Sequence, residues 1–168
     1  MNFKESLGWN GKVYITKKNI KTKEIISQKL YYNMIMNEAL NELIKSVYST
    51  ANMDLKYLGI GTGSTAVTSS DTQLDTEVYR IPIITQYVSG TGQVTSRAIL
   101  LDSEPWTAIP PPTGYQLDIT EIGFFGGVNA TTILNSGLLV SRIVLTTPEQ
   151  KLDNEQITFT RIDSINRA

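Results

Sequence analysis

The side chains in this sequence that could do chemistry are chiefly carboxylates. Asp71, Asp75 and Glu77 fall in one short segment, and Asp118 and Glu121 lie three residues apart in another. Two carboxylates flanking a sugar linkage can hydrolyse it, one as the acid and the other as the base or nucleophile. Residues three apart on a strand point to opposite faces, however, so Asp118 and Glu121 should not converge on one substrate. We therefore interpret these acids as structural.

Two residue types common in enzyme sites are missing, because the 168-residue chain has no cysteine and no histidine. Their absence excludes a thiolate nucleophile, a thiolate zinc site and a Ser-His-Asp triad. The acids of residues 71–77 lack the dense ligand spacing of a calcium loop. Glu77 and Arg80, three residues apart near a turn, are expected to form a structural ion pair. The sequence predicts a protein that is not an enzyme and has no catalytic, metal-binding or cofactor-binding residues.

A run of alternating glycines, Gly59, Gly61 and Gly63, resembles the loops that cradle phosphates. A phosphate-binding loop also needs a lysine that neutralises the phosphates, at a spacing that this segment does not have. We interpret the run as a close-packed strand end instead. Gly59 and Gly61, together with Gly123, are expected to permit close approach of the backbone.

The net charge of −1 conceals an uneven distribution. Residues 1–30 hold seven lysines against two glutamates, and the rest of the chain carries a net charge of −6. One interpretation is a solvated hairpin whose lysines discourage edge-to-edge pairing; another is a basic arm that docks on an acidic neighbour, such as another copy of the chain. Nucleic acid is a disfavoured partner, because no arginine cluster or aromatic platform accompanies the lysines. The candidate interface lysines are Lys12, Lys17, Lys18, Lys21 and Lys23.

Aromatic residues near prolines form a second candidate interface. Trp9, Trp106 and Tyr115 are of the types enriched at interface hot spots, and residues 110–112 are three successive prolines. The same residues could equally cap one end of the hydrophobic core.

The elements that must position these residues are mostly strands. Residues 12–16 and 23–27 predict a hairpin, and residues 30–48 have apolar side chains at the three- and four-residue spacing of an amphipathic helix. Further strands are expected at residues 55–60, 78–88, 94–101, 116–125, 138–145 and 156–162, with a polar turn at 148–155. The prediction is an α+β, mainly β fold of about seven to nine antiparallel strands with one long amphipathic helix near the N-terminus. Residues 1–28 would form a basic arm or hairpin, and residues 29–168 a compact domain.

Four short motifs follow one another in a characteristic order. They are Leu-Gly-Ile-Gly-Thr-Gly at 58–63, a Thr-x-Leu-x-x-Glu-x-Tyr-Arg-x-Pro-Ile pattern within 71–83, Ile-Thr-Glu-Ile-Gly-Phe-Phe at 119–125 and Gly-Leu-Leu-Val-Ser-Arg at 137–142. This order resembles the N-terminal attachment domain of phage tail-collar fibre proteins, over roughly residues 28–163. The residues that carry the resemblance are Gly59, Gly61, Gly63, Leu74, Glu77, Arg80, Glu121 and Gly123.

The resemblance implies a structural component of a tailed-phage virion, acting by protein–protein assembly in the tail fibre, collar or baseplate. In that family the domain is followed by a shaft and a receptor-binding tip, whereas this sequence ends at Ala168, so an attachment module is expected rather than a complete fibre. A capsid decoration protein of the phage head is one alternative. A tail-associated protein that binds glycans through Trp106 and Tyr115, or hydrolyses them through Asp71, Asp75, Glu77 or Asp118, is another.

The expected partners are other virion proteins and further copies of the chain, with a trimer favoured. No apolar run approaches the roughly 18 residues of a membrane span, so no membrane association is expected. The expected location is the virion, after synthesis in the host cytoplasm.

Overall fold

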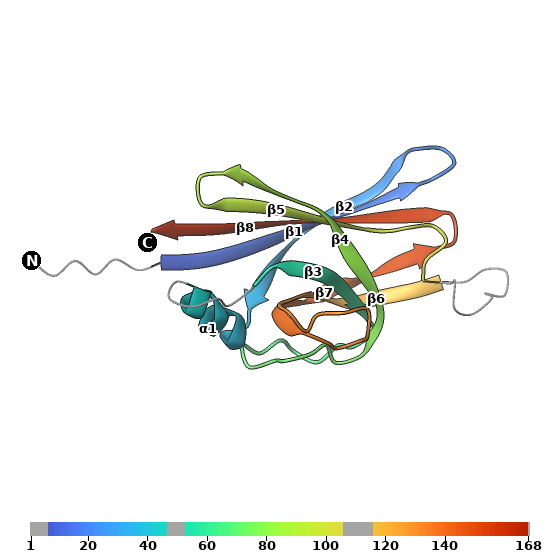
Figure 1. The fold of residues 1–168 in the computed structure, drawn as a ribbon. Coiled ribbons are helices and arrows are strands. Elements are labelled where there is room, and N and C mark those ends of the chain that lie inside the picture. The colour runs from blue at the N-terminus through green and yellow to red at the C-terminus, as the bar shows by residue number, and fades with distance from the viewer. Residues whose placement is uncertain (1–6, 47–52, 106–115, 168) are drawn as a thin grey trace, which may run out of the picture.

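The computed structural model describes residues 7–46, 53–105 and 116–167. Within these ranges the chain forms eight antiparallel strands that close into a barrel, with one helix beside it (Figure 1). The order of strands around the barrel is β1-β2-β7-β6-β3-β4-β5-β8. The elements are β1 (Leu7–Asn19), β2 (Ile25–Ile35), α1 (Asn37–Ser46), β3 (Leu55–Gly61), β4 (Glu77–Gly90), β5 (Gln93–Leu100), β6 (Gln116–Gly126), β7 (Leu138–Leu152) and β8 (Glu155–Arg167).

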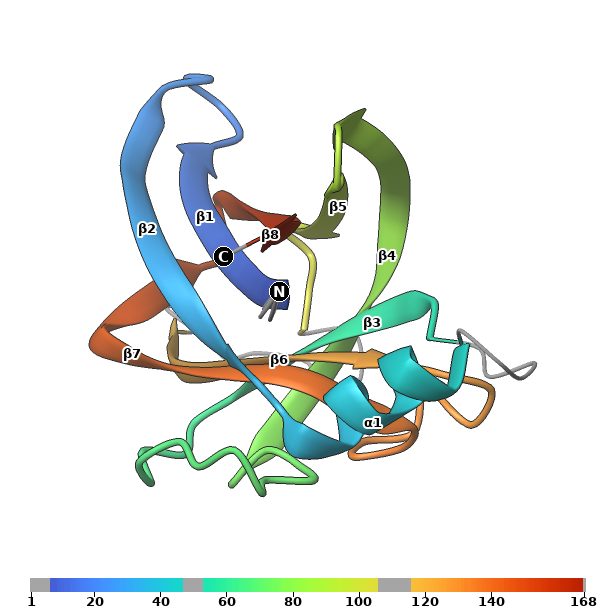
Figure 2. The ribbon, with the colours of Figure 1, turned by 90° about the vertical axis from the view of Figure 1, so that its left-hand side faces the viewer.

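The barrel consists of two sheets that share β2 and β4. The first sheet has the order β2-β1-β8-β5-β4, and the second has the order β2-β7-β6-β3-β4. β4 leaves β3 at Pro82 and pairs with β5 from Ile83 onward. Proline has no backbone N–H for a ladder hydrogen bond, which suits it to a corner between sheets. In Figure 2 the β1–β2 and β4–β5 hairpins rise on either side of β8.

Alternating side chains from both sheets fill the barrel interior. The main core contains fourteen buried apolar residues, which include Val13 and Ile15 of β1, Leu58 of β3 and Phe159 of β8. A smaller core lies beneath α1 and contains Met36, Ala39, Leu74, Phe125, Leu139 and Val140. Burial of these side chains is the main stabilisation of the fold, at about 25 cal/mol per Å² of apolar surface.

The predicted α+β class with one long helix is wrong. Residues 30–35 belong to β2, and the helix covers only the ten residues Asn37–Ser46. Leu30 and Met34 are four apart, a spacing that fits one face of a helix and also one face of a strand. Tyr31 and Tyr32 between them favour a strand, and pairing with β1 and β7 decides the matter. The strand number and the antiparallel pairing agree with the expectation.

One other element boundary differs from that expected. β7 continues through the predicted 148–155 turn as far as Leu152, because residues 149–152 pair with β6. The boundary expected after residue 28 falls inside β2, and β1 pairs with β8 along its whole length. The basic N-terminal hairpin is therefore part of the barrel wall.

Candidate functional site

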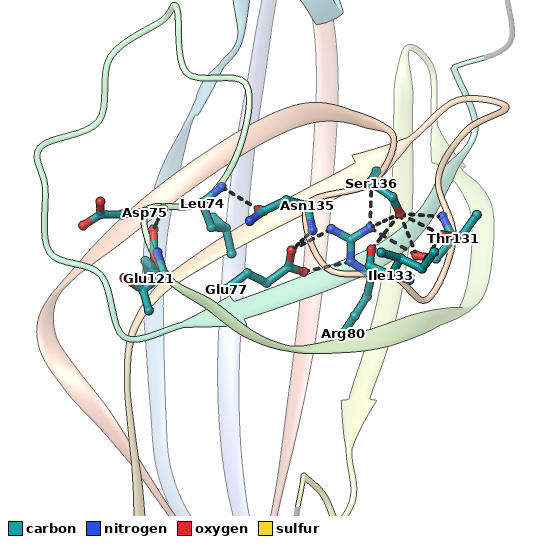
Figure 3. Close-up of polar contacts among 10 residues, drawn as sticks. Leu74, Asp75, Glu77, Arg80, Glu121, Thr131, Ile133, Asn135 and Ser136 are labelled. Atoms are coloured by element: carbon teal, nitrogen blue, oxygen red, sulfur yellow. Dashed lines mark hydrogen bonds and ion pairs between the residues drawn. The ribbon is translucent and has the colours of Figure 1, made fainter. Parts of the chain in front are cut away.

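The motif residues converge around β3, which lies between β4 and β6. Gly61 pairs with Glu77 on one side and Glu121 on the other. Gly59 pairs with Arg80 on one side and Gly123 on the other. Three strands thus bring residues from distant motifs to the same level of the second sheet, where Figure 3 shows their polar contacts.

Glu77 and Arg80 form the ion pair expected from their spacing. Arg80 donates from Nε to Glu77 Oε1 and from Nη2 to Glu77 Oε2, both at 2.8 Å, and the two side chains are at most 1% exposed. Such two-point contacts between guanidinium and carboxylate are among the strongest hydrogen-bonded pairs in proteins. The guanidinium also lies 3.9 Å from the ring centroid of Phe125, which covers its face.

The same pair holds the loop of residues 127–137. Arg80 Nη1 donates to the backbone oxygens of Thr131 at 3.1 Å and Ser136 at 2.7 Å. The backbone N–H of Asn135 donates to Glu77 Oε2. Every donor and acceptor in this buried cluster has a partner, so the cluster ties the loop to β4 (Figure 3).

Glu121 is the centre of a second buried cluster. Its carboxylate accepts hydrogen bonds from the backbone N–H groups of Gly63 at 3.1 Å, Asp75 at 3.1 Å and Thr76 at 2.6 Å. Arg142 of β7 donates to it from Nε at 2.9 Å. Glu121 therefore anchors both ends of the loop of residues 62–76.

Arg142 extends this cluster to the far side of that loop. Its Nη1 lies 2.7 Å from Asp71 Oδ2, and its Nη2 donates to the backbone oxygen of Thr65 at 3.1 Å. Partial burial opposes ionisation of Asp71, but hydrogen bonds from Thr68 and Arg142 outweigh it and lower the pKa of that carboxyl. The pKa of the Arg142 guanidinium is raised, because its bonds to Asp71 and Glu121 outweigh its burial.

The glycines of the motif leave room for these carboxylates. A Cβ atom on Gly59 would contact the carboxylate of Glu77 and the ring of Phe125, and one on Gly61 would lie 2.7 Å from Glu121 Oε1. On Gly123 a Cβ atom would lie 2.7 Å from a methyl carbon of Leu74. No phosphate-like role is needed to explain the run, because side chains of the same molecule fill the space.

The four carboxylates considered for glycan hydrolysis have different surroundings. Glu77 is bound to Arg80, and Asp71 is bound to Arg142. Asp75 is exposed and accepts a hydrogen bond from Thr65 Oγ1 at 2.8 Å, which lowers its pKa. Asp118 is exposed on β6 and bonded to Gln116. Among the described residues no three histidine, cysteine or acidic side chains are grouped so as to hold a metal ion.

The candidate interface lysines occupy different environments. Lys17 is buried and contacts Glu149 at 3.3 Å and Glu155 at 3.7 Å, so it belongs to the structure of the barrel. Lys12 and Lys18 are half-buried on β1, and the Nζ of Lys12 lies 5.8 Å from the ring centroid of Tyr14. Lys21 and Lys23 are exposed in the turn of the β1–β2 hairpin.

Of the candidate aromatic residues, only Trp9 lies within the described part of the chain. It is half-buried at the start of β1, and its Nε1 donates to Asp163 Oδ1 at 2.9 Å. Trp106, Tyr115 and the three prolines between them lie outside the described residues.

Sequence reasoning missed a third buried arginine, Arg161 of β8. It is fully buried, forms a two-point contact with Asp163 at 2.6 Å and donates to Ser141 Oγ at 2.6 Å across the barrel. Its guanidinium lies 4.7 Å from the ring centroid of Phe124. Arg161 and Asp163 are two apart on one strand, so their shared face was a signal available in the sequence.

Exposed apolar side chains mark β2 as a possible contact surface. Ile26, Leu30, Tyr32 and Met34 lie on its outer face at every second position apart from Gln28, and Tyr32 is 77% exposed. We call these four residues the β2 apolar row. In the described part of the chain, β2 pairs with β7 only at Met34 and Ile35, so its first nine residues pair with β1 alone.

Comparisons of the chain with protein-family models, curated protein sequences and solved structures return no match. Within the described residues no helix is both long and apolar enough to cross a membrane.

Proposed function

We propose that this protein is a structural subunit of a tailed-phage particle, an attachment module of the tail fibre, collar or baseplate that acts by protein–protein assembly. The observation that carries the assembly part of the proposal is the β2 apolar row beside an incompletely paired strand edge. An exposed strand that has apolar side chains and free backbone groups is a surface suited to association.

The two buried clusters, around Glu77 with Arg80 and Glu121 with Arg142, also support the proposal. Two of the four candidate acids, Glu77 and Asp71, are engaged with Arg80 and Arg142, which tie two loops to the second sheet. These clusters give rigidity to a scaffold, because each ties a loop to the strands of the second sheet. The assignment to a phage rests on the order of the four sequence motifs.

The proposal is tested by locating the protein on particles. Antibodies raised against the purified chain, coupled to gold, would be bound to purified particles and imaged by electron microscopy. Gold at the tail, collar or baseplate is the expected result. Gold on the head would replace the proposal with capsid decoration, and particles that contain none of the chain by mass spectrometry would overturn it.

A second experiment addresses the β2 apolar row. The variant Tyr32→Asp adds a charge to the most exposed residue of the row and should reduce incorporation into particles. Thr132→Asp, at an exposed position in the loop of residues 127–137, is the control for the added charge. Equal incorporation of the two variants would remove the row from the proposal.

A further inference from the structure

A mainly apolar groove lies at the end of the barrel where β1 begins and β8 ends. Its volume is about 470 Å³, and α1, the β4–β5 hairpin and the adjoining ends of β1 and β8 surround it. The principal apolar residues are Trp9, Leu43, Val88, Val94 and Ile165. Val88 is 78% exposed, so much of this apolar surface faces solvent.

The charges at the groove are negative. Asp54 and Asp163 are among the described residues that line it, and no lysine or arginine is among them. Asp163 is engaged by Arg161 and Trp9 inside the barrel. Asp54 is exposed at the rim of the groove, where its carboxylate lies 3.9 Å from Lys56 Nζ.

The turn of the β1–β2 hairpin has the complementary character. Lys21 and Lys23 are exposed there, and Ile25 and Ile26 beside them are 65% and 48% exposed. The side-chain oxygen of Asn19 accepts hydrogen bonds from the backbone N–H groups of Lys21 at 2.8 Å and Thr22 at 3.1 Å. These bonds order the turn in advance, which reduces the entropy lost when it binds.

The turn and the groove lie at opposite ends of the same molecule. Along β8, Glu155 pairs with Asn19 next to the turn, whereas Ile165 pairs with Trp9 in the groove. Ten residues of strand separate the two positions, which corresponds to roughly 33 Å. The turn therefore cannot enter the groove of its own molecule, and Figure 1 shows the β1–β2 turn and the β4–β5 hairpin at opposite sides of the view.

We propose that the β1–β2 turn of one copy of this chain docks in the groove of a second copy, with Ile25 and Ile26 against Val88 and Val94 and the lysines towards Asp54. This inference rests on the proposed function, because it names a partner for an assembling subunit. The contact joins two different surfaces, so repetition of the contact produces a ring where the rotation closes and a filament where it does not. The occupant is a second copy because it supplies both an ordered apolar turn and the charge opposite to that of the groove.

Cysteine cross-linking tests the contact directly, since the chain has no cysteine of its own. Copies with Lys21→Cys would be mixed with copies with Val88→Cys and treated with a short bifunctional thiol reagent. A covalent dimer in the mixture, and little in either variant alone, is expected. Mixing Lys21→Cys with Asp118→Cys is the control, because Asp118 pairs with Gln150 near the turn end of the barrel. Absence of the dimer from the first mixture, or equal yields in both mixtures, would overturn the proposal.

Association of the full chain would also be measured by sedimentation over a range of concentrations. Val88→Asp should weaken self-association about tenfold, since a buried apolar contact at an interface is worth more than about 1 kcal/mol. Ile84→Asp is the matched control, because Ile84 is also exposed on β4 but does not line the groove. Equal effects of the two variants, or a monomer at all concentrations, would contradict the docking.

Charge exchange gives a third test of the same contact. Lys21→Glu combined with Lys23→Glu should weaken association, and Asp54→Lys in the same chain should restore part of it. A lack of restoration would show that the lysines do not face Asp54.

The failure of this inference can be told apart from failure of the proposed function. A chain that is present in particles but shows no cross-linking overturns only the docking of the turn. A chain that cross-links as expected but is absent from particles overturns only the phage assignment.

Discussion

Glu121 of β6 and Arg142 of β7 form a forked contact in which two guanidinium nitrogens approach one carboxylate oxygen. Nε and Nη2 of Arg142 lie 2.9 Å and 2.8 Å from Glu121 Oε2, and neither side chain is more than 3% exposed. The other oxygen of Glu121 accepts backbone hydrogen bonds from the 62–76 loop. A single buried carboxylate therefore joins two strands and one loop.

Removing the charge of Glu121 should destabilise the protein strongly. Glu121→Gln leaves Arg142 with Asp71 as its remaining carboxylate and puts an amide where charged oxygens accept the backbone N–H groups of the 62–76 loop, which typically costs about 1 to 3 kcal/mol. Urea unfolding followed by circular dichroism would measure the loss. The double variant Glu121→Leu with Arg142→Met should lose less than the sum of the two single variants, since neither charge is then left alone. Additive losses would show that the two side chains are not coupled.

Arg80→Lys should release the 127–137 loop while the barrel stays folded. A lysine cannot reproduce the two-point contact with Glu77 and also bond the oxygens of Thr131 and Ser136. Amide hydrogen exchange at residues 131–136 should become about tenfold faster, which corresponds to a loss of 1.4 kcal/mol in local stability. Arg97→Lys, at an exposed position on β5, is the control and should leave exchange in the loop unchanged.

Gly59→Ala should lower the free energy of unfolding by about 1 to 3 kcal/mol, because the added methyl group overpacks a filled site. That methyl would meet the Glu77 carboxylate and the Phe125 ring. Gly8→Ala is the matched control, since the nearest atom to its Cβ would be 3.7 Å away, at ordinary contact distance. Thermal unfolding of the two variants side by side gives the comparison, and equal losses would contradict the packing argument.

Lys151 should make stability depend on pH in the alkaline range. Its side chain is fully buried, and burial lowers its pKa from 10.5 to about 8. The folded state releases this proton more readily than the unfolded state does. The free energy of unfolding should therefore rise between pH 8 and pH 10.5, and this gain should be lost as the pH falls back to 8. The observable is the difference in unfolding free energy between the natural chain and Lys151→Met, measured at both ends of that range.

A matched control keeps this pH prediction specific. Lys23→Met removes an exposed lysine from the hairpin turn, so the natural chain should show no comparable gain over it. A difference between the natural chain and Lys151→Met that stays constant from pH 8 to pH 10.5 would contradict the lowered pKa.

Local patterns in the sequence were sufficient for several features. The spacing of Glu77 and Arg80 near a turn led to their ion pair, and alternating apolar residues with glycine turns led to the antiparallel strands. Both depend on residues close together in the chain, where the geometry of a turn or a strand sets which side chains meet.

The period of the apolar pattern was not sufficient to predict that residues 30–35 form a strand rather than a helix. Leu30 and Met34 satisfy the repeat of a helix and of a strand, and the choice depends on β1 and β7 being available to pair. The charge pattern also did not predict which of the seven N-terminal lysines are buried in the barrel. Lys17 is one of them, and it is bound to Glu149, which is 132 positions away in the chain.

Chain-local chemistry thus settled most of the strands, the pair of Glu77 with Arg80 and the exclusion of thiolate and imidazole chemistry. Closure of the barrel between β1 and β8 settled which charges are buried together, and it brought Arg161 to Ser141 and Phe124 on the opposite sheet. The physical reason is that a buried charge is stable only beside specific partners, and those partners come from strands whose neighbours are chosen by the whole fold rather than by their own sequence.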